Sequence, residues 1–433
     1  MAADDTLSDG ALAGGALLAA RRTVYLLSLE EPMAKACPAP QPLRMVFGTI
    51  VFITVLFLLV FLGRLVFSPL MPAILADPEV GIEAGQAGSL FLLGAFGTLF
   101  GSIVAGFISC RIKHRGAMAV SIFLIALTLF GAYFAKSLWG LRAVFIVLGM
   151  LAGLHLPSSV ATVAATVRKE DWGKAMSIQQ LGPPISLVAG PLLSALLLRW
   201  FAWNEVLLWI AGLTALLGLA YLVFTPGVGS FPGDPPNPSL LKPVFATRSF
   251  WVMMWLFALA IGAQVGVFTM LPLYLSDERG MALSSANTLL GLANAAPLAT
   301  VFISGWLTGR IGEKRTIGIF MLLTGVATVL VGVTSGVALK VFIVVMAALA
   351  VCIFPPAFSA VSRIVQPNYR SLAAAFCSPI AFVFGGGLLP TALGYMGQAW
   401  SFSTGIIIVG AVIAVGSSAV LLLRLLDNLE EGC

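Results

Sequence analysis

The chain has 433 residues, of which 59% are hydrophobic and 10% charged, whereas about 25% of the residues in a soluble domain are charged. Its formal net charge is +6, and its basic residues are scattered between apolar blocks. This composition excludes a soluble globular enzyme, a disordered protein and a nucleic-acid-binding protein, because water could not solvate so much apolar surface. The lipid bilayer is therefore the expected solvent and partner of the chain.

Residues 1–44 form a region separate from the rest of the chain. They are rich in Ala and Gly, carry mixed charge, include three prolines near their end and show no long helical period. A segment of this composition cannot bury enough apolar surface to fold, so we predict a disordered cytoplasmic tail.

From residue 45 onward, apolar blocks of about 20 or more residues follow one another, and each is long enough to cross a hydrocarbon core of about 30 Å. A Pro- and Gly-rich stretch at 227–248 cannot be a helix, and it divides the blocks into two sets of six. We predict an all-α membrane protein with six-helix bundles at 45–226 and 249–426, a cytoplasmic linker between them and a cytoplasmic C-terminal tail at 427–433. The twelve predicted transmembrane helices are 45–72, 86–108, 116–137, 140–166, 175–198, 206–226, 249–275, 283–308, 316–336, 338–364, 372–396 and 402–426.

Lysine and arginine are distributed unequally between the two sets of loops. With the N-terminus inside, 18 of the 24 fall on the cytoplasmic side and 5 on the outer side, while Arg64 lies within a span. Loops rich in Lys and Arg stay in the cytoplasm, so we predict a multi-pass protein of the inner (plasma) membrane with both termini cytoplasmic.

The two sets of six helices are related in sequence. Residues 63–72 match 263–272 at an offset of 200, and residues 106–115 match 305–314 at an offset of 199. Six-helix halves repeated in parallel orientation are typical of a transporter that binds its substrate between the halves.

These repeated residues resemble the major facilitator superfamily over about 45–426. The loop signature of that family is Gly-x-x-x-Asp-Arg/Lys-x-Gly-Arg/Lys after the second helix, and the chain shows it in both halves. Its residues here are Gly106, Arg111 and Arg115 in the first half and Gly305, Arg310 and Lys314 in the second half.

The signature departs from the family pattern at two places. The family Asp is replaced by Cys110 and Gly309, and the inner Gly of the first half is replaced by Lys113. In the family that Asp helps to latch the cytoplasmic gate, so the resemblance implies a different or weaker latch here. It also implies the twelve-helix major facilitator fold and alternating access, in which the halves rock about a central site.

Arg64 is the most informative residue of the first predicted helix. Some 19 apolar or small residues precede it, and about 16 Å of helix separates it from the outer end. All 18 Asp and Glu fall in tails or loops, so no carboxylate within a span can neutralise it. A buried Arg is costly unless it is paired or faces a wet cavity. An anionic substrate would neutralise the charge of Arg64, because the planar guanidinium donates two parallel hydrogen bonds to a carboxylate, phosphate or sulfonate.

The alternative is a structural Arg that is tied to backbone carbonyls or anchored at the outer rim.

An Arg eight residues before Pro72 also resembles the anion-binding position of the organic-anion and organophosphate branches of the superfamily. The organophosphate porters have a second, symmetry-related Arg in the seventh helix, where this chain has Gln264. The resemblance therefore favours a monoanion or a small carboxylate over a phosphate dianion.

His155 lies about halfway along the fourth predicted helix. It is a candidate for a substrate hydrogen bond or for a proton-coupling site, because histidine titrates near physiological pH. The alternative is a neutral histidine bonded to a neighbouring helix. Proton symporters usually have a membrane-embedded Asp or Glu, which this chain lacks, so we expect an anion exchanger, a facilitator, or proton movement with the substrate or through His155.

Several amide and hydroxyl side chains are further candidates for binding the substrate, although such groups more often join helices to one another. The five cysteines are far apart and only two histidines are present, so no metal site, cofactor site or catalytic set is expected. The candidates, after Arg64 and His155, are Gln264, Asn294, Gln180, Gln179 and Ser159.

The sequence is thus interpreted as a monomeric secondary transporter, not an enzyme, that moves a small organic anion across the inner membrane. One alternative is a drug or metabolite efflux transporter of the same fold. The other is a transporter-like sensor or assembly protein whose tail 1–44 binds a partner.

Overall fold

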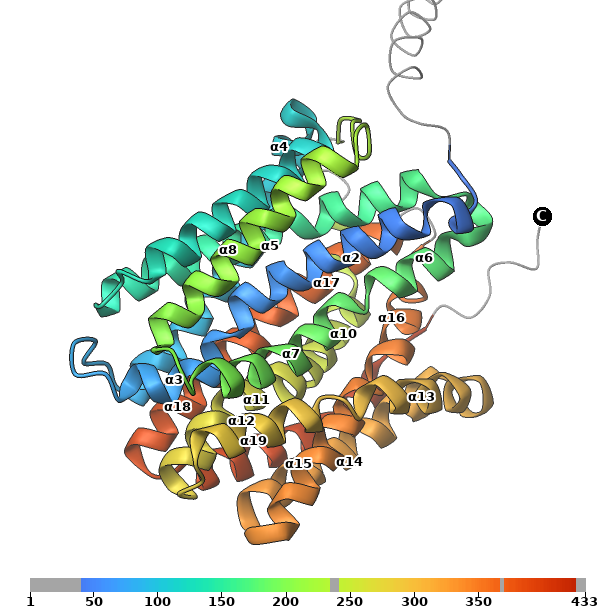
Figure 1. Ribbon diagram of the computed structural model, residues 1–433. Coiled ribbons are helices and arrows are strands. Elements are labelled where there is room, and N and C mark those ends of the chain that lie inside the picture. Colours follow the sequence, from blue (N-terminus) through green and yellow to red (C-terminus); the bar gives the residue numbers. More distant parts are fainter. Residues whose placement is uncertain (1–39, 234–240, 367–369, 426–433) are drawn as a thin grey trace, which may run out of the picture.

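The computed structural model describes residues 40–233, 241–366 and 370–425. Within these ranges the chain is helical and forms no sheet (Figure 1). Eleven helical segments are long and apolar enough to cross a membrane. The longest, α4 (Ala84–Ala132), contains two helices joined at Lys113, where φ is 64° and ψ is 164°. The described residues therefore form twelve transmembrane helices, as the sequence predicts.

The first half contains six of these helices. The first begins at Leu43, two residues before the predicted start, and α4 supplies the second and third. The elements are α2 (Leu43–Leu65) with α3 (Phe67–Leu75), α4, α5 (Leu138–Thr166), η1 (Lys169–Asp171) with α6 (Trp172–Gln179) and α7 (Gly182–Leu197), and α8 (Trp203–Phe224).

The second half repeats this order after the short helix α9 (Leu241–Ala246). This helix lies within the stretch 227–248, so the prediction that the whole stretch is free of helix was wrong at its end. Pro243 is tolerated there because it lies in the first turn, where the backbone N–H has no partner within the helix. The seventh and eleventh transmembrane helices each include π-helical turns, labelled η3, η4 and η6. The elements are α10 (Arg248–Ile261), η3 (Gly262–Val267), α11 (Phe268–Leu273), η4 (Tyr274–Glu278), α12 (Leu283–Ala293), α13 (Pro297–Ile311), α14 (Glu313–Val333), α15 (Gly336–Val351), α16 (Phe354–Ser362), α17 (Arg370–Phe382), η6 (Val383–Leu388), α18 (Leu389–Ala399), α19 (Phe402–Gly416) and η7 (Ser417–Leu422).

The end of the molecule where α2 begins and the chain turns at Lys113 and Gly312 is called here the basic end, and the opposite end is called the far end. At the basic end the chain ahead of α2 is tied to the loop after α5. The backbone N–H of Gln41 donates to the carbonyl of Thr166 at 3.0 Å, and the N–H of Leu43 donates to the Asp171 carboxylate at 2.9 Å. Residues 40–44 are therefore ordered, and the remainder of the predicted tail lies outside the described residues.

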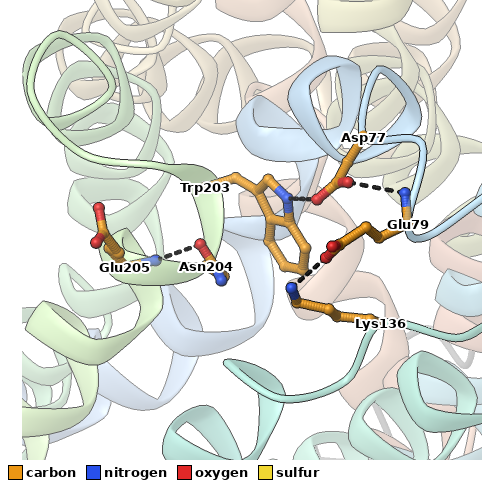
Figure 2. Close-up of polar contacts among 6 residues, drawn as sticks. All are labelled: Asp77, Glu79, Lys136, Trp203, Asn204 and Glu205. Carbon is orange, nitrogen blue, oxygen red and sulfur yellow. Dashed lines mark hydrogen bonds and ion pairs between the residues drawn. The ribbon is translucent and has the colours of Figure 1, made fainter.

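At the far end, polar side chains join the loops of the first half (Figure 2). The indole N–H of Trp203 donates to one oxygen of Asp77 at 2.9 Å, and the backbone N–H of Glu79 donates to the other at 3.0 Å. The hydrogen bond from Trp203 holds the pKa of Asp77 below its ordinary value, and that from Glu79 acts in the same direction. Lys136 forms an ion pair with Glu79, so the loops before α4, α5 and α8 are held together.

The second and fourth transmembrane helices are in backbone contact. A Cβ at Gly149 would lie 2.1 Å from the carbonyl oxygen of Gly94, and one at Gly153 would lie 2.2 Å from that of Thr98. Only glycine permits so close an approach, which is a common device for packing helices in a membrane. The face of the second helix that carries Gly94, Gly97 and Gly101 thus packs within its own half.

The two halves are hydrogen-bonded to each other only toward the far end, as far as the described residues show. Each of these bonds lies between the level of Arg64 and the far end of the helices, so the far end is closed. The bonds run from Ser68 Oγ to the Thr269 carbonyl at 2.9 Å, from Asn287 Nδ2 to the Pro69 carbonyl at 3.0 Å, from Thr391 Oγ1 to the Gly88 carbonyl at 3.1 Å, and from Gln398 Nε2 to Glu83.

Candidate functional site

Arg64 lies in the last turn of α2, directly before the break between α2 and α3. Pro69 has no N–H to donate to the carbonyl of Leu65, so the helix is interrupted here. Arg64 is 7% exposed, and its Nη1 donates to Thr98 Oγ1 on α4 at 2.7 Å. Thr98 in turn donates to the carbonyl of Gly94 at 2.9 Å, which leaves its oxygen directed to Arg64 as an acceptor.

Two aromatic rings flank the guanidinium. Its central carbon lies 4.5 Å from the ring centre of Phe382 in α17 and 5.4 Å from that of Phe61 in α2. Cation–π contacts of this kind stabilise a desolvated cation. No carboxylate pairs with Arg64 among the described residues, and the hydrogen bond to Thr98 uses one of its five N–H donors. Because Arg64 is buried, it is not an anchor at the outer rim, and its hydrogen bond goes to a side chain, whereas the alternative expected backbone carbonyls.

Arg64 lines a small cavity between the halves, of about 10 Å³. That space is at the lower limit for one water molecule. Its other lining residues come from both halves and are mostly apolar: Leu65, Phe91, Gly94, Ala95, Phe145, Val265, Phe382 and Gly386.

A second cavity of about 30 Å³ lies on the far side of Leu65 and Val265, which line both cavities. It is more polar than the first, because Ser68, Ser186 and Thr269 contribute to its walls. The two cavities form a divided space along the boundary between the halves.

Asn294 lines the second cavity, whereas Gln264 lines neither. Asn294 is the C-cap residue that follows α12, and its Nδ2 donates to the carbonyl of Leu290 at 2.9 Å. Gln264 lies half-buried in the π-helical turn η3, close in sequence to Val265. The structure thus brings Arg64 and Asn294 to neighbouring cavities, whereas Gln264 lines neither cavity and directly precedes Val265, which lines both.

His155 lies elsewhere, inside the first half. It is fully buried, and its Nδ1 lies 2.9 Å from Ser121 Oγ. Ser121 donates its single hydroxyl hydrogen to the carbonyl of Met118, so the histidine is assigned as the donor at Nδ1. Its Nε2 is then an acceptor that has no partner among the described residues.

Two phenylalanines separate His155 from Arg64. The ring of His155 stacks on Phe57 at 6.2 Å, Phe57 meets Phe61 edge-on at 5.0 Å, and Phe61 lies beside Arg64. The two titratable residues are therefore linked by an aromatic path along α2 and do not share a cavity.

Gln179 and Ser159 belong to the His155 region. Gln179 Nε2 donates to Ser159 Oγ, and both side chains are fully buried. The side-chain oxygen Oε1 of Gln179 and the hydroxyl Oγ of Ser158 are buried and have no partner among the described residues. Gln180, by contrast, is exposed at the end of α6.

The signature residues of the first half have partners in their own half or in the chain that follows it. Arg115 donates to the carbonyls of Leu222, at 2.8 Å, and Thr225, where its charge complements the C-terminus of α8. Cys110 Sγ donates to the carbonyl of Gly233 at 2.8 Å. Arg111 is exposed, and the Gly106 carbonyl accepts from Ser109 at 3.1 Å.

The signature of the second half is arranged differently. Arg310 lies over the ring of Trp306 at 4.0 Å, a Cβ at Gly305 would meet no atom within 4 Å, and Lys314 lines a separate cavity. Gly312 has φ 82° and ψ 164°, close to the φ of 64° and ψ of 164° at Lys113. Gly312 and Lys113 occupy equivalent positions in the repeat. The two loops thus share one backbone conformation despite the exchange of Gly for Lys.

Sequence reasoning missed Thr98, Phe61 and Phe382 as neighbours of Arg64. Thr98 stands between Gly94 and Gly101 on a face that the sequence already marks as close-packed. Phe382 comes from the other half, more than three hundred positions along the chain, and no sequence signal distinguishes it from the other phenylalanines.

The chain matches the family pattern of the Major Facilitator Superfamily over residues 53–296 and 274–432. It belongs to this superfamily. Solved structures of the same fold include a bacterial homologue of the human lysosomal transporter Spinster, in an inward-facing and occupied conformation, at TM-score 0.73 and 14% identity. That alignment covers 89% of this chain and 97% of the other.

Two known proteins are similar to the chain in sequence. The 4-hydroxybenzoate transporter PcaK of Pseudomonas aeruginosa is 22% identical over 423 residues, covering 87% of this chain and 92% of PcaK. A multi-drug resistance efflux pump PmrA homologue of Lactococcus lactis is 26% identical over 163 residues. That second match spans 36% of this chain and 40% of the pump.

Proposed function

We propose that this protein is a secondary transporter of a small organic monoanion, a carboxylate first of all, and that Arg64 binds the anion. The observation that carries the proposal is a buried guanidinium at the boundary between the halves, with no carboxylate partner in the described chain. A carboxylate would accept two of its free N–H donors. Transport by alternating access across the inner membrane, with the basic end in the cytoplasm, completes the proposal.

The rings around Arg64 favour an aromatic or otherwise apolar carboxylate. Phe91, Phe145 and Phe382 line its cavity, and Phe61 lies beside the cation. Such walls suit a ligand that is apolar except for one charged group. The likeness to a 4-hydroxybenzoate transporter over most of both chains supports the same class.

The closed far end is consistent with one state of an alternating-access cycle, in which the path from that end to Arg64 is shut. Cavities of about 10 and 30 Å³ are far smaller than the several hundred Å³ of ordinary ligand pockets. An organic anion can reach Arg64 only after the halves move apart. The hydrogen bonds that join the halves lie on the far side of Arg64, so we infer that access opens first from the basic end.

The test is counterflow of labelled 4-hydroxybenzoate and other carboxylates, sulfonates and phosphates in proteoliposomes. We expect Arg64→Ala to weaken substrate binding at least about 100-fold, because two charge-assisted hydrogen bonds are lost. Arg199→Ala removes an exposed cation and serves as the control. A folded Arg64→Ala protein that transports at the wild-type rate would remove Arg64 from the site.

We propose His155 as the proton-coupling residue. Its buried Nε2 acceptor, which has no partner among the described residues, supports this role. Counterflow over a range of pH should lose its pH dependence in His155→Gln. Uptake that requires an imposed pH gradient and persists in this variant would exclude the relay.

Efflux of a drug or metabolite is the second candidate, favoured by the partial match to the multi-drug efflux pump. A transport screen that finds export of neutral or cationic compounds, and no effect of carboxylates, would favour it. A role as a sensor or assembly protein predicts that a chain starting at Met45 loses its function, whereas a transporter would keep transport activity.

A further inference from the structure

A separate cavity of about 650 Å³ lies at the basic end of the second half. It is formed by the beginning of α14, the residue that directly follows α16 and the turns at η7. None of its residues belongs to the Arg64 cavities. The lining residues are Ile311, Gly312, Glu313, Lys314, Arg315, Gly318, Ile319, Arg363, Val420, Leu421 and Leu425.

The cavity carries an excess of positive charge. Three cations, Lys314, Arg315 and Arg363, face a single carboxylate, Glu313. Glu313 is engaged by Arg363 at 2.8 Å and by the hydroxyl of Ser359 at 3.0 Å. Within the described chain, neither Lys314 nor Arg315 has an ion pair or hydrogen bond from its side chain. Two cations on the cavity wall are therefore available to an anion.

The internal repeat shows how this cavity differs from its counterpart. Lys314 occupies the position of Arg115, as the matching backbone angles at Gly312 and Lys113 indicate. Arg115 is bound by carbonyls at the end of α8, and the backbone N–H groups at 114 and 115 donate to Phe231 and Gly229 of the linker. The first half thus uses this charge within the fold, whereas the second half leaves it beside a cavity.

The walls of the cavity suit a molecule that has an apolar part next to its charge. Ile319 is 43% exposed and Leu421 is 80% exposed, so large apolar side chains adjoin the cations on the outside of the helices. A phospholipid has this order of groups, with a phosphodiester at the interface and acyl chains below it. Basic pockets between transmembrane helices are known to hold anionic head groups.

We propose that Lys314 and Arg315 bind the phosphate of an anionic phospholipid, whose acyl chains lie along Ile319 and Leu421. The site holds the lipid in the leaflet at the basic end of the molecule. It is independent of the substrate that Arg64 binds.

The experiment is native mass spectrometry of the full-length protein in detergent, titrated with phosphatidylglycerol or phosphatidylcholine. We expect tighter binding of phosphatidylglycerol, and about 30-fold weaker binding in the double variant Lys314→Gln with Arg315→Gln, because each cation near a lipid surface contributes to attraction. The matched control is Arg168→Gln with Lys169→Gln, which removes an exposed Arg and Lys at the same end. The control should bind as wild type does.

Three results would overturn the proposal. The first is equal loss of phosphatidylglycerol in both double variants, which would mean that net charge and not this cavity attracts the lipid. The second is displacement of the lipid by glycerol phosphate at equal concentration, which would indicate a site for free phosphate. The third is binding that occurs only after removal of residues 426–433, whose three carboxylates would then be the occupant. Thermal unfolding of each variant checks that the fold is intact.

Discussion

At the scale of single residues, Lys113 and Gly312 show what the repeat demands of the backbone. Both adopt a positive φ with ψ near 164°, a conformation that is essentially restricted to glycine. Lysine at this position stores strain of about 1–3 kcal/mol. The strain persists because the segments on both sides of it are held, by Gly233 and by the linker that follows α8.

Lys113→Gly should therefore stabilise the protein by about 1 kcal/mol, after subtraction of the roughly 0.5–1 kcal/mol that glycine costs through the unfolded chain. Thermal unfolding in detergent measures the change. Gly312→Ala is the matched reverse variant and should destabilise the protein. A lower unfolding temperature for Lys113→Gly would show that the lysine side chain contributes more than the strain removes.

Arg64 and His155 illustrate two different fates of a buried polar residue. Arg64 is bordered by rings and one hydroxyl and faces a cavity between the halves. His155 is packed inside one half, with one nitrogen bound and the other unpartnered within the described residues. In the proposed transport cycle, separation of the halves would open the cavity beside Arg64, whereas a substrate would reach His155 only through motion within its own half.

At the scale of elements, the contact between α4 and α5 positions Thr98, and through it Arg64. The glycines allow the two backbones to touch, so the hydroxyl of Thr98 is held against α2 at a fixed depth. A side chain in this contact would push the helices apart and displace the acceptor of Arg64.

Gly149→Ala should destabilise the protein by about 1–3 kcal/mol, since its Cβ would lie 2.1 Å from the Gly94 carbonyl. It should also reduce transport, because Thr98 moves with α4. Gly212→Ala is the control: this glycine lies within α8, and a Cβ there would meet no atom within 4 Å. The measurements are thermal unfolding and counterflow, and equal stability of the two variants would contradict the argument.

At the scale of the whole molecule, the far end acts as a closed gate built from hydrogen bonds between the halves. Ser68 and Asn287 each bond to a backbone carbonyl across the boundary. Each such bond contributes about 0.5–1.5 kcal/mol, so a pair can shift the balance between two arrangements of the halves severalfold or more.

The double variant Ser68→Ala with Asn287→Ala should populate an arrangement that is open at the far end. Spin labels at 134 and 337, which are exposed at that end in different halves, would report it as a longer distance, in a background whose native cysteines are replaced by serine. Thr288→Ala on α12, whose hydroxyl bonds within its own helix, is the control. An unchanged distance distribution in the double variant would mean that packing alone closes the gate.

The sequence by itself predicts the twelve helices, the two halves and the lack of a carboxylate within the spans that could pair with Arg64. Lengths of apolar runs, the linker at 227–248 and the absence of carboxylates from the spans can all be counted along the chain. The membrane enforces these features, because a buried backbone must form helices and a buried charge is costly.

Only the tertiary structure decided which side chains meet. It placed Thr98 and Phe382 beside Arg64, separated His155 from that site, and left the cavity beside Lys314 open while the equivalent position at Arg115 is bound. The physical reason is that these helices are apolar on almost every face. Their sequence pattern therefore sets how deep a residue lies in the membrane but does not set which neighbour it faces, and close packing between helices settles that choice.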